Sequence, residues 1–167
     1  MNFYTEKKIH QGRAIEVCWF GYRGNGHVLR SAVPALRKNK LNLSIISDDL
    51  VTVCDYGNED YKPNERWTRW NLETCNDEII KSDIVIMPGS TNPKFKYKSN
   101  NKIVASWLLG MPVAQHSEDL ERFLDPEVRQ KEADKNYEIA KRDYEVKLSV
   151  EEYKKVIEEC YGRRKAG

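Results

Sequence analysis

The chain has 167 residues, of which 40% are hydrophobic and 32% charged, and this is typical of one domain with a single core. Its 28 basic and 26 acidic side chains leave a net charge of only +2, which argues against a protein that covers a nucleic-acid backbone with charge. No stretch approaches the ~20 apolar residues of a membrane-spanning helix, and the first residues lack a signal-peptide pattern. We therefore expect a cytoplasmic protein without a membrane span.

Cysteine and histidine are few and scattered. The three histidines and four cysteines form no C-x-x-C pair and no ligand spacing, so neither a disulfide scaffold nor a structural zinc site is indicated. We expect no metal and no cofactor. The cysteines are Cys18, Cys54, Cys75 and Cys160.

Short apolar runs alternate with helical patterns over residues 15–115. Strands are predicted at residues 15–20, 43–47, 84–87 and 112–115, and helices at residues 26–40, 72–81 and 100–109. Pro34 predicts a kink in the first helix, or a restart at Ser31. This alternation is typical of a parallel sheet with right-handed crossovers and helices on both faces. We predict a single Rossmann-like α/β domain spanning residues 1–167.

Two parts of this pattern carry further expectations. Residues 48–66 are polar and rich in turn-forming residues, and predict a loop or strand-plus-loop insertion before a strand at residues 67–70. The helix at residues 100–109 should end at Gly110 and Pro112. Its apolar face should be buried on the sheet, and consists of Ile103, Val104, Trp107 and Leu108.

A strongly charged helical flank is predicted over about residues 118–161, packed on the sheet. One apolar stripe runs along its first part at helical spacing. A capping box formed by Ser149 and Glu152 predicts the start of a separate final helix. The stripe consists of Ala133, Tyr137, Ala140, Tyr144 and Leu148.

Ligands of open parallel sheets bind at the carboxyl ends of the strands, where helix N-termini present free N–H groups. The sequence GYRGNGH follows the first predicted strand and leads into a helix. Its glycines permit close backbone approach to a ligand, and Arg23 supplies a cation for a phosphate. The spacing matches neither a Walker motif nor G-x-G-x-x-G, and a tight turn explains the glycines equally well.

A second segment, KFKYKSNNK, precedes the helix at residues 100–109, where Ser99 or Asn100 can cap. Positive side chains oppose the dipole at a helix N-terminus, so their grouping favours a bound anion over a merely solvated loop. The lysines are Lys94, Lys96, Lys98 and Lys102. A third segment, residues 115–118, follows the last predicted strand, and there we expect Ser117 to serve only as a helix N-cap.

These residues also carry a family resemblance. The run SDIVIMPG, a loop and then KSNNKIVASWLLGMPVAQ resembles the C-terminal, donor-binding half of nucleotide-sugar glycosyltransferases of the two-Rossmann-domain (GT-B) type. The turn after WFG and the paired charged helices at the end are similar to that half as well. The match covers about residues 15–160, and its specific part is residues 83–115.

The resemblance implies that two segments hold the diphosphate of a nucleotide sugar. The turn after the first strand would contribute Gly21, Arg23, Gly24 and Asn25. The second helix start would contribute Lys98, Ser99 and Asn101, with a structural or phosphate-binding role for Lys102. It implies a retaining sugar transfer without a metal, in which the site neutralises charge on the leaving diphosphate.

The chain departs from the family pattern in two ways. Where many such enzymes have a ribose-binding glutamate, the nearby positions are Val104, Ala105 and Ser106. The acceptor half of the two-domain fold does not fit into 167 residues, so sugar transfer would need a partner chain or a missing N-terminal domain. An alignment of GNGH with the acceptor half, which would make His27 functional, fits the charged tail and KSNNK less well.

The sequence is also compatible with two other functions. The same pocket would serve a non-catalytic module that binds a nucleotide or phosphorylated sugar. A nucleic-acid binder using Trp67, Trp70 and the lysines is disfavoured by the near-neutral charge, because a strand with one face in the core explains the two tryptophans. No catalytic residue is assigned, since Asp48 and Asp49 are more typical of a turn.

Overall fold

A computed structural model describes residues 6–51, 64–89, 100–144 and 146–165. Its centre is a five-stranded sheet in the order β3-β2-β1-β4-β5, in which every pair is parallel. This confirms the predicted Rossmann-like α/β fold. The strands are β1 (Glu16–Gly21), β2 (Asn42–Ser47), β3 (Glu65–Arg69), β4 (Ile84–Ile86) and β5 (Val113–Ala114).

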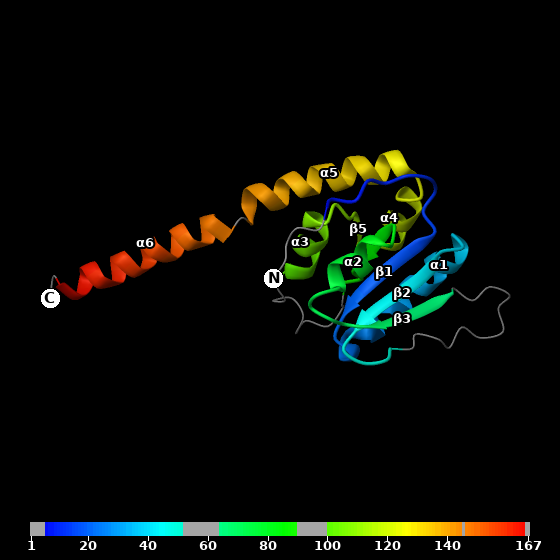
Figure 1. The fold of residues 1–167 in the computed structure, drawn as a ribbon, viewed down its shortest axis with the longest axis horizontal. Coiled ribbons are helices and arrows are strands. Elements are labelled where there is room, and N and C mark those ends of the chain that lie inside the picture. Colours follow the sequence, from blue (N-terminus) through cyan, green and yellow to red (C-terminus); the bar gives the residue numbers. More distant parts are fainter. Residues whose placement is uncertain (1–5, 52–63, 90–99, 145, 166–167) are drawn as a thin grey trace.

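Helices connect the strands and cover both faces of the sheet (Figure 1). The described helices are η1 (Arg23–Ala32, a 3-10 helix), α1 (Val33–Lys38), α2 (Cys75–Ile80), α3 (Asn101–Leu108), α4 (Ser117–Arg122), α5 (Pro126–Asp143) and α6 (Val146–Lys165). Alternate residues of β1 enter two separate cores, because successive side chains of a strand point to opposite faces. Trp19 packs with Leu29 and Leu36 of the η1–α1 layer, whereas Phe20 packs with Ile79 of α2.

Several predicted boundaries differ from the structure. The expected helix at residues 26–40 is divided into η1 and α1, and the α-helix restarts at Val33 rather than Ser31, because Pro34 is tolerated only in the first helical turn. The third strand begins at Glu65, inside the segment predicted as an insertion. Residues 52–63 of that segment lie outside the described residues.

The helical flank also needs correction. α4 and Val128 at the start of α5 pack against the core of the sheet as predicted, and α5 packs against α3 as well. The predicted helix start at Ser149 is wrong, because α6 already begins at Val146 and Ser149 lies within it. Ser117 is the first helical residue of α4 and not its cap; the carboxylate of Asp119 instead accepts the backbone N–H of His116.

The apolar face predicted for α3 is only partly buried. Val104 is buried, Ile103 and Trp107 are half-buried, and Leu108 is 40% exposed. The expectation that all four lie on the sheet was wrong, because the buried positions of α3 are Val104 and Ser106 and the helix contacts α5 as well as β5. Gly110 has a φ of 69° and ends the helix as predicted.

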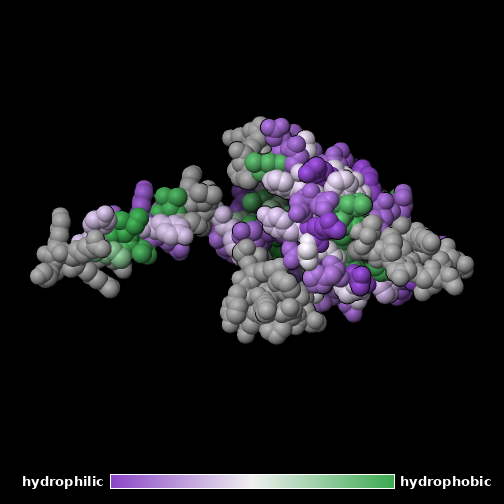
Figure 2. All heavy atoms as spheres, turned by 90° about the horizontal axis from the view of Figure 1, so that it is seen from below, coloured by the Kyte–Doolittle hydropathy of each residue, from purple (hydrophilic) through white to green (hydrophobic). Residues whose placement is uncertain are grey.

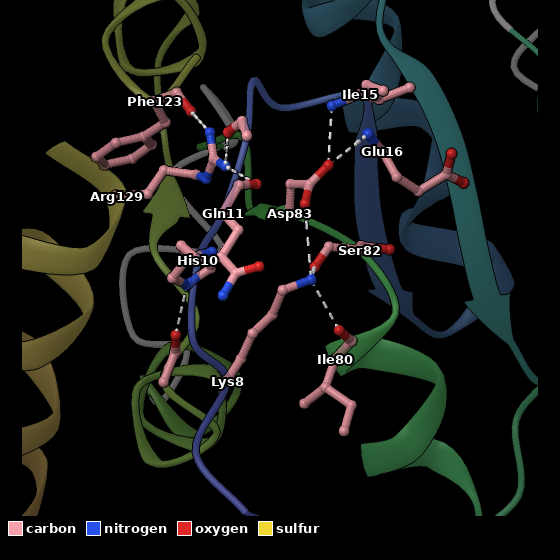
Figure 3. A network of polar contacts seen from close by, with 12 residues as sticks. Lys8, His10, Gln11, Ile15, Glu16, Ile80, Ser82, Asp83, Phe123 and Arg129 are labelled. Atoms are coloured by element: carbon pink, nitrogen blue, oxygen red, sulfur yellow. Dashed lines mark hydrogen bonds and ion pairs between the residues drawn. The ribbon is translucent and has the colours of Figure 1, made fainter. Parts of the chain in front are cut away.

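The N-terminal segment, residues 6–14, ties the end of α3 to α5 at the amino ends of the strands (Figure 3). Arg129 of α5 is fully buried and donates to the carbonyls of Phe123, Leu124, Gln11 and Gly12. Lys8 donates to the carbonyls of Ile80 and Ser82. This segment is therefore part of the fold, although its sequence shows no periodic pattern.

The last helix is arranged differently from the others. α6 extends away from the body of the molecule (Figure 1), and hydrophobic side chains gather on it (Figure 2). The described ones are exposed by 44–71%: Val150, Tyr153, Val156, Ile157 and Tyr161. No helix among the described residues is long and apolar enough to cross a membrane.

Candidate functional site at the carboxyl edge

The strand order changes direction between β1 and β4, and the crevice at the carboxyl ends of such a pair is where open α/β sheets bind ligands. The chain leaves β1 at Gly21 and enters η1 at Arg23, while β4 leads toward α3. The turn after β1 and the described start of α3, residues 100–102, therefore lie at this end of the sheet, here called the carboxyl edge.

Lys102 joins these two segments. It stands in the first turn of α3, yet its ammonium group lies against Gly21, so that a Cβ atom at position 21 would collide with it. The same nitrogen is 5.5 Å from the centre of the Trp19 ring, which is 2% exposed. Lys102 is half-buried. The structure thus brings a half-buried lysine from α3 to the end of β1, as convergence of the two segments requires.

The other predicted residues of the turn are exposed or internally bonded. Arg23 and Gly24 are exposed, and the backbone N–H of Asn25 donates to the carbonyl of Tyr22 at 2.9 Å. His27 is exposed, with Nδ1 3.0 Å from the carbonyl oxygen of Gly24. Its position agrees with a surface residue of a helix turn.

The α3 side of the site is described in part. Asn101 is exposed at the first position of α3, and Asn100 holds the N-cap position without a side-chain cap hydrogen bond. Lys98 and Ser99 lie outside the described residues, as do Lys94 and Lys96. The expectation that Lys98 and Arg23 reach one ligand therefore stays a prediction.

Two carboxylates that the sequence pattern indicates only as turn residues, Asp48 and Asp49, bond to the first residue of η1. Asp48 Oδ1 accepts the backbone N–H of Arg23 at 2.7 Å, and Asp49 Oδ2 lies 2.5 Å from Nη1 of the same arginine. The N–H of Leu50, and then Arg23, hold the pKa of Asp49 below its usual range. Their place directly after a strand was visible in the sequence, but the pairing with Arg23 follows from the register of β1 and β2, which the sequence does not show.

These contacts define what the edge offers a ligand. Lys102 and Arg23 are cations, and η1 and α3 both begin here. Among the described residues, no group of three or more His, Cys, Asp and Glu side chains is arranged to hold a metal ion. The described charges at this edge are therefore two cations, Lys102 and Arg23, and two carboxylates, Asp48 and Asp49.

No protein-family model and no curated protein sequence matches this chain.

Proposed function

We propose that this chain is a glycosyltransferase-like domain that binds the diphosphate of a nucleotide sugar at the carboxyl edge, between β1 and β4. The observation that carries the proposal is the placement of Lys102 from α3 against Gly21 at the end of β1. Sugar transfer would follow when a partner chain or a further domain supplies the acceptor side of the cleft.

The chemistry assigned to the edge is electrostatic. When the bond between the sugar and the diphosphate breaks, negative charge grows on the leaving diphosphate. Lys102 and Arg23 would neutralise that charge, together with the lysines that precede α3 in the sequence. Such a site works best when water is excluded, which is why the transfer step is assigned to the completed cleft.

The proposal is tested by calorimetric titration with the diphosphates of uridine, adenosine and guanosine and with their sugar derivatives. We expect Lys102→Gln to weaken binding of the preferred diphosphate by about tenfold or more, the usual value of a charge-assisted contact of roughly 1.5 to 3 kcal/mol. Lys131→Gln, which removes an exposed charge from α5, is the matched control. Equal affinities for these two variants would contradict the proposed site.

A binding module without chemistry is the second candidate, and one observation favours it. The two carboxylates described at this edge, Asp48 and Asp49, both bond to Arg23 rather than standing ready as acid or base. The two functions are separated by following release of the nucleoside diphosphate from a bound nucleotide sugar. Binding without release, also after the chain is presented with acceptor saccharides, would indicate the module.

A further inference from the structure

The loop after β2 lies beside the turn after β1 because of the strand register. β1 and β2 pair in parallel with Gly21 opposite Ser47. Both strands therefore end at the same level of the sheet, so residues 48 and 49 come next to residues 22 and 23. The two loops thus share one end of the sheet.

Asp48 and Asp49 accept hydrogen bonds from both the backbone N–H and the guanidinium group of Arg23. The backbone N–H of Arg23 donates to Asp48 at 2.7 Å, and its guanidinium donates to Asp49 at 2.5 Å. These are the groups with which a helix start and an arginine bind phosphate. Carboxylates of the chain itself therefore occupy the position of a ligand anion.

The backbone around Asp49 is anchored, whereas its ion pair is not enclosed. The carbonyl oxygen of Asp49 accepts hydrogen bonds from the Ser47 hydroxyl at 2.6 Å and from Trp67 Nε1 at 3.1 Å. The side chains of Arg23 and Asp49 are 62% and 59% exposed. An exposed ion pair is weak, so an anion of higher charge can replace Asp49 without moving the loop.

We propose that Asp49 is an internal competitor for the diphosphate site: it holds Arg23 in the empty protein and gives it up when a diphosphate binds. This inference rests on the proposed function. It adds a selectivity device, because a ligand must outcompete a carboxylate that is always present. A singly charged anion gains little by replacing Asp49, whereas a diphosphate carries more charge than the carboxylate it displaces.

The test is a double-mutant cycle measured by calorimetric titration with uridine, adenosine and guanosine diphosphates. We expect Asp49→Asn to tighten binding by about three- to tenfold, since the amide fills the same space and can still accept the N–H of Leu50. In the Arg23→Gln background, the same change should have no effect. Asp49→Ser is a second neutral variant, and thermal unfolding checks that all of them are folded.

Glu121→Gln is the control for net charge. It removes one carboxylate from the exposed ion pair that Glu121 forms with Lys38 at the end of α1, outside the carboxyl edge. If the control tightens binding as much as Asp49→Asn, or if the gain persists without Arg23, the inference is overturned while the proposed function stands. If neither the wild type nor the Asp49 variants bind any of the diphosphates, both fail.

Discussion

A Cβ atom added to the glycines at positions 24 and 26 would meet different surroundings. At Gly26 it would lie 2.5 Å from Cγ1 of the buried Val51, whereas at Gly24 no atom of the described residues lies within 4 Å. Neither residue has a positive φ. Gly26 is therefore required by packing, and Gly24 is left as the glycine whose open space can admit a ligand.

Alanine substitutions separate these two roles. We expect Gly26→Ala to lower the free energy of unfolding by about 1 to 3 kcal/mol through overpacking, and Gly24→Ala to change it by less than about 0.5 kcal/mol. Denaturant unfolding measures both. If the backbone at Gly24 contacts a diphosphate, Gly24→Ala will weaken ligand binding at unchanged stability. A loss of stability in this variant would show that the space at position 24 is closed.

His10 makes the stability of the fold depend on pH. It is 6% exposed, and Nε2 lies 2.8 Å from the carbonyl oxygen of Gly110. Burial lowers its pKa below 6.5, and the nearby charges of Lys8 and Arg129 act in the same direction, against the hydrogen bond to Gly110 and the charge of Asp83. The folded protein thus holds His10 neutral, with Nε2–H donating to the carbonyl.

The sign follows from proton linkage. Because the unfolded chain binds this proton more readily, the stability from neutral His10 is complete above pH 6.5 and is lost as the pH falls toward the lower pKa of the folded state. We expect the free energy of unfolding to decrease between pH 7.5 and about 5.5, and to do so less steeply in His10→Gln. Equal slopes in the two proteins would exclude His10 as the cause.

At the scale of elements, the contrast between α5 and α6 comes from the side chains on one face. The buried positions of α5 are Arg129, Ala133, Asn136 and Ala140, and they follow helical spacing. The two alanines permit close approach to α3. α6 has an apolar stripe as well, but its described members remain exposed, so periodicity predicted a helix in both cases without telling which one is docked.

This difference has a measurable consequence. We expect a chain shortened after Tyr144 to unfold at the same temperature as the full chain, because the described apolar side chains of α6 bury little surface. Thermal unfolding followed by circular dichroism at low concentration measures this. A midpoint lower by more than about 3 °C, which corresponds to roughly 1 kcal/mol for a domain of this size, would show that α6 stabilises the body.

For the whole molecule, sequence patterns predict the layers better than the contacts between distant segments. The strands predicted at residues 15–20 and 84–87 contain the continuous apolar runs VCWF and IVIM, as is typical of buried parallel strands, and the structure confirms both strands. The position of the candidate site, at the carboxyl ends of β1 and β4, follows from the order of the strands in the sheet. The pairing of Arg23 with Asp49 depends on strand register, and the burial of Arg129 depends on carbonyls from the N-terminal segment; neither leaves a periodic signal.

The N-terminal segment also bears on the order in which the chain assembles. Lys7 donates a hydrogen bond to Asp134, which follows it by 127 residues. The backbone N–H of His10 donates to the side-chain oxygen of Gln130. A ribosome makes residues 6–14 before α5. The hydrogen bonds between residues 6–14 and α5 therefore cannot form until α5 has been synthesised. Contacts of such large separation slow folding, and the amino edge of the sheet is expected to close last.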